Sequence, residues 1–369
     1  MTAMLEQGRT NSLSEVRQLA LRCMAKKRPF FIWGPPGIGK SDLMQQITDS
    51  YENAHLIDVR LPLWDPTDIK GMPYYAANDN TMKWAPPAEL PSAEMAKKYD
   101  TIVLFLDELN AAPQAVQAAA YQLILNRRVG TYVLPDNVVI AAAGNRESDK
   151  GVTYRMPKPL ANRFVHFEVR VDFNDWFDWA VANDIHADVV GYLTANKQDL
   201  YDFDPSADSR SFATPRSWAF VSELLDDEDD GISPELITDL VAGAVGEGLA
   251  IKFMAHRKVA GQMPNPTDIL DGKVKELKTK EISAMYSLTT SLCYELKESF
   301  ELATKDGAMP EWHKRADRFF KFIMDNFETE MVVLGSRTAI KNYSLPFNHK
   351  KMESFKVFYE KFGKLISKA

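Results

Sequence analysis

The clearest chemical feature of this sequence is a loop that could bind phosphate. Residues 34–41 read Gly-Pro-Pro-Gly-Ile-Gly-Lys-Ser and satisfy the pattern G-x-x-x-x-G-K-[ST]. Glycines in such loops let backbone N–H groups point at phosphates, and the helix that follows adds positive partial charge at its N-terminus. We expect Lys40 to contact the terminal phosphates of a nucleotide and Ser41 to be a Mg²⁺ ligand. The loop residues predicted to bind the nucleotide are Gly34, Pro35, Pro36, Gly37, Ile38, Gly39, Lys40 and Ser41.

Two carboxylates form the second chemical feature. Asp107 and Glu108 end the continuously apolar run 101–106, 67 positions after Lys40. If that run is a parallel strand, both side chains emerge at the carboxyl edge of the sheet, beside the phosphate loop. We expect Asp107 to bind the nucleotide's Mg²⁺ and Glu108 to orient and deprotonate the attacking water. The alternative is an acidic pair that only caps a helix.

The elements that position these residues alternate between strands and helices. Five runs read as strands, and four of them are nearly continuous in apolar residues: 30–33, 55–63, 101–106, 137–143 and 164–171. Helix-like segments separate most of them, which predicts an α/β fold with a mainly parallel sheet between helices. The phosphate loop lies between the first strand and a helix, as its chemistry requires. This context disfavours the alternative of a surface turn rich in glycine and proline.

Helical periods replace the strands after residue 171, with an acidic break at 226–231. We predict three parts: a nucleotide-binding domain over 1–171, a helical lid domain over 172–261 and a helical C-terminal extension over 262–369.

Composition excludes several classes of protein. The 44 basic and 51 acidic residues give a net charge of -7, so there is no global attraction to nucleic acid or to an anionic membrane. Two cysteines, Cys23 and Cys293, are too few for a disulfide framework or a thiolate zinc site. No apolar run is long enough to insert into a membrane and no signal core is evident, so we expect a soluble cytoplasmic protein.

Several motifs, taken in order, resemble the AAA+ ATPases, and within them the MoxR-like, dynein-related branch. The resemblance covers residues 12–225 and rests on GPPGIGKS, LFLDELNAAPQAVQAA, VGTYVLPDNVVIAAAGN, PLANRF and TPRSW. It implies a P-loop NTPase αβα sandwich with a five-stranded parallel sheet in the order 5-1-4-3-2. It also implies a helical lid, a hairpin before the fourth strand and an insertion near the second helix.

The resemblance also implies roles for three further residues. Asn145 matches sensor 1, which helps position the hydrolytic water. Arg163 matches the arginine finger that reaches the γ-phosphate in a neighbouring subunit, and Arg216 matches sensor 2 in the lid. Taken alone, these residues suggest only a turn, a solvated arginine and the start of a helix. The predicted catalytic residues are Glu108, Asn145, Arg163 and Arg216.

The sequence departs from the family pattern at two places. Ala111 follows Asn110 where the family often has a basic residue, and Arg146 follows Asn145 where proline is common. Arg146 and Arg155 are further candidates for contacts between subunits.

The stretch 65–73 resembles the MoxR-like insertion region. Four aromatic residues nearby could contact a client or could equally pack the hairpin on the core: Trp64, Tyr74, Tyr75 and Trp84.

Two other patterns are interpreted as structural. Residues 196–199 spell the guanine-reading N-K-x-D, but they follow a helix-like segment rather than a strand, so adenine is preferred over guanine. His55, His166 and His186 lack metal-ligand spacing.

The last 29 residues contain seven Lys and two Glu, interleaved with aromatic residues. Such a tail could bind RNA, DNA or an acidic partner. It also reads as an amphipathic helix whose aromatic face packs inward, which we favour.

From these features we predict an ATP-driven machine that remodels a protein client. The resemblance implies a ring, expected to be a hexamer, with ATP between Lys40 and a neighbour's Arg163, and a partner bearing a von Willebrand factor A domain. One alternative is an ATP-driven nucleic-acid motor or loader that uses the Lys-rich tail. Another is a scaffold that binds ATP without useful turnover.

Overall fold

The structure is a computed structural model that describes residues 9–149, 154–207, 209–225, 231–278 and 280–366. Internal contacts divide these residues into two units. The first contains the described residues up to Asp172 together with Asp204–Ala207, and the second contains Phe173–Phe203 and the described residues after 208. The further division of the helical part at residue 261 stays a prediction.

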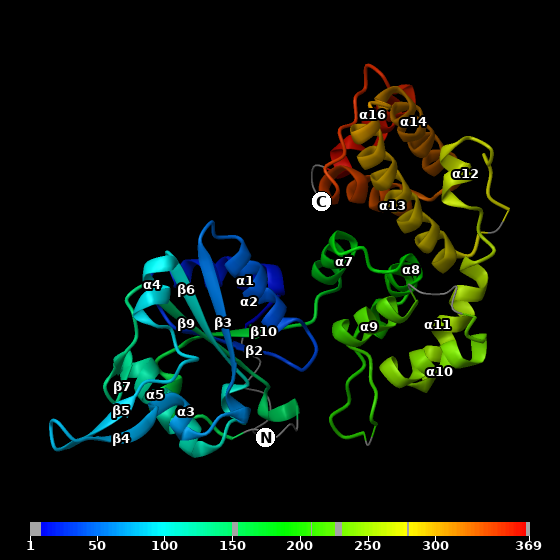
Figure 1. The fold of residues 1–369 in the computed structure, drawn as a ribbon. Helices are drawn as coiled ribbons and strands as arrows, with labels where there is room; N and C mark the ends of the chain where they lie inside the picture. Colours follow the sequence, from blue (N-terminus) through cyan, green and yellow to red (C-terminus); the bar gives the residue numbers. More distant parts are fainter. Residues whose placement is uncertain (1–8, 150–153, 208, 226–230, 279, 367–369) are drawn as a thin grey trace. The chain divides into compact units, whose positions relative to one another are not determined.

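The first unit is built on a parallel sheet with the strand order β1-β10-β2-β9-β6-β3 (Figure 1). Its strands are β1 (Thr10–Asn11), β2 (Phe30–Trp33), β3 (Ala54–Arg60), β6 (Thr101–Asp107), β9 (Val138–Gly144) and β10 (Val165–Val169). The α/β class is therefore confirmed. The five strands predicted from the sequence follow one another in the predicted order 5-1-4-3-2.

The predicted number of strands was wrong, because β1 adds a sixth strand at the edge of the sheet. Thr10 pairs with Glu168 and Asn11 with Val169 of β10. Two polar residues show neither an apolar run nor an alternation, so the sequence contains no signal for this strand.

Helices cover both faces of this sheet. Figure 1 shows α1 (Leu13–Ala25) and α2 (Lys40–Asp49) on one side and α5 (Gln114–Asn126) on the other. The central strands β6 and β9 are apolar and buried over nearly their whole length, as expected for strands covered on both faces. Smaller helices of this unit are α3 (Pro66–Lys70), α4 (Ala93–Lys98) and α6 (Lys158–Ala161).

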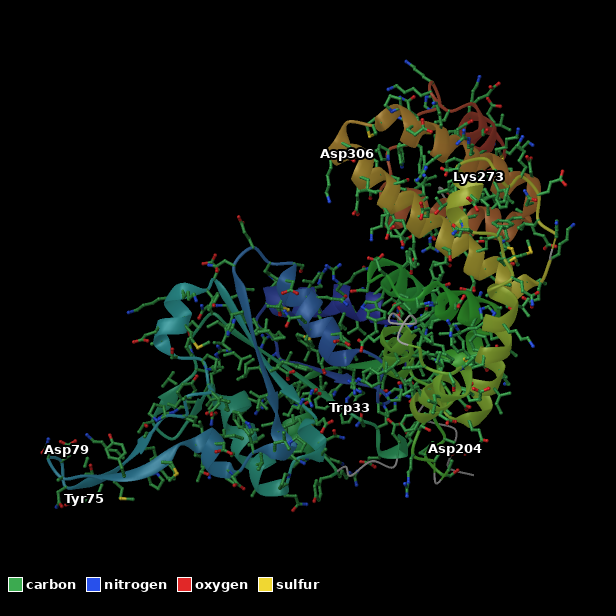
Figure 2. All side chains as sticks on the ribbon, turned by 45° about the vertical axis from the view of Figure 1, so that its right-hand side comes forward. Trp33, Tyr75, Asp79, Asp204, Lys273 and Asp306 are labelled. Atoms are coloured by element: carbon green, nitrogen blue, oxygen red, sulfur yellow. The ribbon has the colours of Figure 1, made fainter. Side chains whose placement is uncertain are left out.

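Two antiparallel hairpins interrupt the alternation of strands and helices. One joins β4 (Met72–Ala76) to β5 (Thr81–Ala85), and the other joins β7 (Arg128–Val129) to β8 (Tyr132–Val133). The turn of the shorter hairpin touches the base of the longer one, because Thr131 Oγ1 donates a hydrogen bond to the carbonyl oxygen of Trp84 over 3.3 Å. Figure 2 shows Tyr75 and Asp79 at the far end of the longer hairpin.

The second unit is helical throughout its named elements. These are α7 (Phe173–Ala182), α8 (Ala187–Ala195), α9 (Pro215–Leu225), α10 (Pro234–Val245), α11 (Glu247–Ala260), α12 (Pro266–Leu270), α13 (Ile282–Asp306), α14 (Met309–Asn326), α15 (Thr329–Arg337) and α16 (Glu353–Ile366). The acidic run predicted to interrupt them lies at 226–230, outside the described residues. In the part of the chain that the structure describes, no helix is both long and apolar enough to span a membrane.

The basic aromatic tail packs as favoured from its sequence. Phe355 and Phe358 of α16 are buried, and their rings lie 4.8 Å and 4.7 Å from that of Phe320 in α14. The lysines of the tail that the structure describes are exposed: Lys341, Lys350, Lys351, Lys356, Lys361 and Lys364. The aromatic side chains therefore belong to the core of the second unit, and the charge belongs to its surface.

Candidate nucleotide-binding site

The phosphate loop turns tightly between β2 and α2. Gly37 and Gly39 have φ values of 74° and 91°, a left-handed conformation that favours glycine. A Cβ on Gly34 would lie 2.7 Å from Cδ1 of Ile38 and 3.2 Å from Cβ of Val169. The glycines are therefore needed here both for backbone conformation and for space.

Lys40 points back across this loop. Its Nζ donates hydrogen bonds to the carbonyl oxygens of Gly34 at 2.8 Å and Pro35 at 2.9 Å, and to Oδ1 of Asn145 at 3.0 Å. The ammonium is thus held at the N-terminal end of α2, where the helix dipole already favours an anion.

Ser41 and Asp107 come together although they are 66 positions apart. Ser41 Oγ donates to Oδ2 of Asp107 over 2.9 Å, and Asp107 is 8% exposed. The two residues meet because β2 and β6 flank β9 in the sheet and end at the same edge.

This pair has the chemistry of a Mg²⁺ site, since a hydroxyl and a carboxylate are hard oxygen ligands. Among the described residues, no group of three or more His, Cys, Asp or Glu side chains could hold a metal ion. Ser41 and Asp107 are the residues that would hold Mg²⁺, whose charge would offset that of a bound phosphate. Burial and, after it, the charge of Asp107 raise the pKa of Asp58 in β3, and the charge of Arg60 opposes them.

Glu108 ends the strand with a sharp turn. Its φ of 54° is left-handed, and its N–H donates to Oδ1 of Asp107 over 2.9 Å. A non-glycine residue in this conformation is strained by about 1–2 kcal/mol. Its exposed carboxylate therefore follows directly on the buried one of Asp107.

Asn145 follows the end of β9 and joins the cluster through Lys40. The N–H of Gly34 donates to the carbonyl oxygen of Gly144 over 3.3 Å, so the phosphate loop and the end of β9 are also linked by backbone. The structure thus brings together Lys40, Ser41, Asp107 and Asn145, with Glu108 adjacent.

Arg163 lies away from this cluster, in the turn before β10. Val165 pairs with Phe30 and Glu168 with Trp33, so Arg163 is next to the start of β2 whereas the phosphate loop follows its end. A four-residue strand is about 13 Å long. Arg163 is exposed at the amino edge of the sheet, where it cannot complete the pocket of its own chain.

The remaining predicted arginines differ in their surroundings. Arg216 is exposed in the first turn of α9, in the second unit. Arg146 is engaged within its own chain, because its Nε donates to Oε2 of Glu168 over 2.9 Å. Arg155 is exposed.

Asn110 also lies at this site, although the sequence alone did not point to it. The sequence showed only that the residue after Asn110 departs from the family pattern. Asn110 is 2% exposed, and its Nδ2 donates to the carbonyl oxygen of Asn145 over 2.7 Å. Its position two residues after Glu108, at the end of a buried strand, was the one available signal.

The patterns interpreted as structural have structural partners. Asp199 of the N-K-x-D run is buried and accepts a hydrogen bond from the Tyr192 hydroxyl over 2.6 Å. The ring of His55 stacks on Tyr99, and His166 Nδ1 accepts from Trp33 Nε1 over 2.9 Å. These groups stabilise helices and strands rather than forming a second centre.

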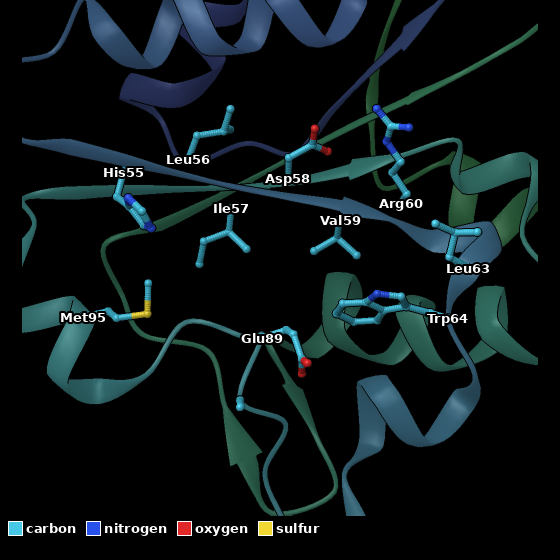
Figure 3. Close-up of a pocket in the computed structure, with 11 residues that line it drawn as sticks. His55, Leu56, Ile57, Asp58, Val59, Arg60, Leu63, Trp64, Glu89 and Met95 are labelled. Carbon is cyan, nitrogen blue, oxygen red and sulfur yellow. The ribbon is translucent and has the colours of Figure 1, made fainter.

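A groove of about 540 Å³ runs along the outer edge of β3, the last strand of the sheet. Figure 3 shows His55, Ile57 and Val59 on the side of β3 that faces Met95 and Trp64. The described residues that line this groove include none of the phosphate loop, so the nucleotide site is a separate feature.

The family match lies within the first unit. Residues 29–164 match the model of the AAA domain of the dynein-related subfamily. The chain is 27% identical over 185 residues to midasin from Giardia intestinalis, a match that covers 47% of this chain and only 4% of that protein.

Two solved structures resemble the chain distantly. A RuvB variant from Thermotoga maritima has a TM-score of 0.34 at 19% identity, and the match covers 67% of this chain and 72% of the RuvB chain. NtrX from Brucella abortus in complex with ATP has a TM-score of 0.40 at 14% identity, and the match covers 80% of this chain and 66% of the NtrX chain. The family match spans the phosphate loop, the carboxylate pair and Asn145, and it ends just after Arg163. Residues 29–164 are therefore the part of the chain that is similar to an AAA domain of the dynein-related subfamily.

Proposed function

We propose that this chain is an ATP hydrolase whose reaction takes place at the carboxyl edge of the sheet in the first unit. The observation that supports this most is the pair of contacts at that edge, Ser41 to Asp107 at 2.9 Å and Lys40 to Asn145 at 3.0 Å. They unite a cation, a magnesium-type oxygen pair and a polar amide at the N-terminus of α2. Anionic phosphates are the ligand that such an arrangement suits.

Each residue has a distinct task in the proposed reaction. Lys40 binds the terminal phosphates, and Ser41 and Asp107 would hold Mg²⁺, which when bound neutralises phosphate charge. Asn145 orients a water molecule whose oxygen bonds to the γ-phosphorus while the bond to the β–γ bridging oxygen breaks. Glu108 accepts the proton of that water, a contribution of about 10²–10⁴ in rate. The products are ADP and inorganic phosphate.

Arg163 would act on the nucleotide of a neighbouring subunit. Its place at the amino edge of the sheet, away from its own phosphate loop, is what a residue acting across an interface requires. We therefore propose a ring, expected to be a hexamer, with Arg216 of the lid contacting nucleotide as sensor 2. The MoxR-like assignment belongs to the same proposal.

The β4–β5 hairpin is the proposed contact with a protein client. Four of its large side chains are 48–65% exposed: Met72, Tyr74, Tyr75 and Met82. Apolar side chains gathered on a projecting element favour contact with another chain. The proposed partner bears a von Willebrand factor A domain, and residues 1–369 contain no D-x-S-x-S metal motif of that kind. The nucleic-acid alternative rests on the exposed lysines of the tail alone.

Phosphate release from ATP tests the proposal directly. Glu108→Gln should lower kcat at least about 100-fold while the protein still binds ATP. Glu94→Gln, an exposed carboxylate in the first turn of α4, is the control and should keep the parental rate. If Glu108→Gln hydrolyses ATP as fast as the parent, Glu108 is not the base. The same variant, loaded with ATP, serves to capture the client.

A further inference from the structure

Asn110 is buried where two strand ends of the site meet. It lies in the short turn η2 (Leu109–Ala111), directly after the carboxylate pair. Its Nδ2 donates to the carbonyl oxygen of Asn145 over 2.7 Å, and Asn145 Oδ1 accepts from Lys40 over 3.0 Å. A chain of two hydrogen bonds thus connects Asn110 through Asn145 to the lysine of the phosphate loop.

The carboxamide of Asn110 is buried and packs closely against Gly144. A Cβ on Gly144 would lie 2.0 Å from Oδ1 and 2.9 Å from Cγ of Asn110. Gly144 does not have a left-handed φ, so glycine is needed here for space and not for backbone conformation. The side chain of Asn110 is therefore pressed against the backbone of Gly144, next to the residue that it holds.

One half of the carboxamide is unsatisfied. Oδ1 of Asn110 is buried and has no hydrogen-bond partner among the residues that the structure describes. A buried polar atom without a partner is destabilising, and an apolar side chain would avoid that penalty. What an apolar side chain lacks is the donor that Nδ2 supplies to Asn145. The useful part of Asn110 is therefore this donor.

We propose that Asn110 is a positioning residue for Asn145. By holding the carbonyl group of Asn145, it keeps that residue's side chain facing Lys40 and the terminal phosphate. Asn110 itself does not touch the nucleotide in this role. The inference rests on the proposed function, because Asn145 is the residue assigned there to orient the attacking water.

The first test is a double-mutant cycle on ATP hydrolysis. Asn110→Ala and Asn145→Ala should each lower kcat about 10- to 100-fold and change KM less than about threefold, because orientation is lost and not phosphate binding. The double variant should be no slower than Asn145→Ala, within about twofold, since Asn110 acts only through Asn145. The proposal is overturned if the losses of kcat in the two single variants multiply in the double variant. It is also overturned if Asn110→Ala keeps the parental kcat.

Asn137 supplies a matched control at the other end of β9. Its Nδ2 donates to the carbonyl oxygens of Ala96 at 3.0 Å and Tyr99 at 2.7 Å, far along the strand from the phosphate loop. Asn137→Ala should lower the melting temperature as Asn110→Ala does but leave kcat unchanged. An equal loss of kcat in both variants would reduce Asn110 to a structural residue.

Asn110→Asp tests the donor without changing the shape of the side chain. Its carboxylate would face the carbonyl oxygen of Asn145 without a proton to donate, whereas the protonated acid can donate one. The ratio of kcat in Asn110→Asp to that of the parent should therefore rise between about pH 8 and pH 6. A constant ratio in the folded variant contradicts a role that depends on a donated proton.

Hydrogen exchange separates this inference from the proposed function. If the parent protein releases phosphate no faster than Lys40→Ala, the proposed function fails whatever Asn110 does. The positioning contact is then judged by exchange in the protein without nucleotide. Asn110→Ala should speed exchange in a peptide covering residues 144–146 about fivefold or more and leave β2 unchanged. Unchanged exchange at 144–146 overturns the inference.

Discussion

Two hydrogen bonds from a hydroxyl to an aspartate, one in each unit, look alike by themselves. Ser41 donates to Asp107 over 2.9 Å, and Tyr192 donates to Asp199 over 2.6 Å. The two aspartates are 8% and 7% exposed. Length and burial alone therefore do not tell a site from a core.

The surroundings of the two aspartates separate them. Asp107 lies at the carboxyl ends of the strands, near Lys40 and Asn145 and close to the N-terminus of α2. Asp199 lies among aromatic rings, with Trp218 Nε1 donating to its carbonyl oxygen over 2.9 Å. A carboxylate at a helix N-terminus can exchange partners with a ligand, whereas one enclosed by packed rings can only stabilise.

The largest expected effect concerns Arg163, which we propose acts on the nucleotide beside Asp107 of a neighbouring subunit. Arg163→Ala should lower ATP hydrolysis about 10³–10⁵-fold, because an arginine supplied by a neighbour stabilises charge in the transition state. Inactive Arg163→Ala and inactive Lys40→Ala subunits are then mixed and phosphate release is measured. Mixed rings should regain activity where an intact Arg163 meets an intact Lys40. No recovery despite proven co-assembly would contradict action across an interface.

Replacing Asp107 tests the comparison itself. Asp107→Asn should lower kcat about 10²–10³-fold, or roughly 2.7–4 kcal/mol, because the negative oxygen ligand is lost. Asparagine can keep both contacts of Asp107, because its Oδ1 accepts from the Glu108 N–H while its Nδ2 donates to Ser41 Oγ. The free energy of unfolding should therefore change by less than about 1 kcal/mol. Hydrolysis and urea unfolding measure the two quantities. If Asp107→Asn is much less stable but hydrolyses ATP at the parental rate, Asp107 is a structural residue and not part of the site.

The Asp199 contact should show the opposite behaviour. Tyr192→Phe leaves a buried carboxylate without its hydroxyl donor, so the free energy of unfolding should fall by about 1–3 kcal/mol. Asp199 also lies 3.9 Å from Lys252 Nζ, a distant partner that limits the loss. The rate of ATP hydrolysis per folded molecule should remain within about twofold of the parent. If Tyr192→Phe keeps its full stability but hydrolyses ATP more slowly, the N-K-x-D run takes part in the reaction.

The smallest expected effect concerns pH in the second unit. Burial lowers the pKa of His256, against the opposing charges of Asp188 and Glu281. The unfolded chain then binds the proton more readily, so stability is present above the unfolded pKa near 6.5 and falls at lower pH, by at most about 1.4 kcal/mol per pH unit. Urea unfolding between pH 7 and 5 should show a shallower fall in His256→Gln. An identical slope in both proteins would contradict this assignment.

Much of the site could be predicted from local patterns. The phosphate loop has fixed spacing, and Asp107 and Glu108 end a strand whose continuous apolar character is legible in the sequence. Three features could not be predicted in this way: the strand β1, the groove along β3 and the contact of Asn110. Each depends on segments far apart in the sequence, such as Thr10 with Glu168 and Asn110 with Asn145.

The sequence by itself determined the residue types and the local elements, because periodicity, turn chemistry and motif spacing act over short stretches of chain. The tertiary structure decided which polar residues became neighbours. Ser41 follows the carboxyl end of β2 and Asp107 ends β6, so the two residues meet at the same end of the sheet. Arg163 precedes β10, which runs parallel to β2, and therefore lies at the opposite end. Direction in a parallel sheet is a property of the whole assembly of strands, so no single segment encodes it.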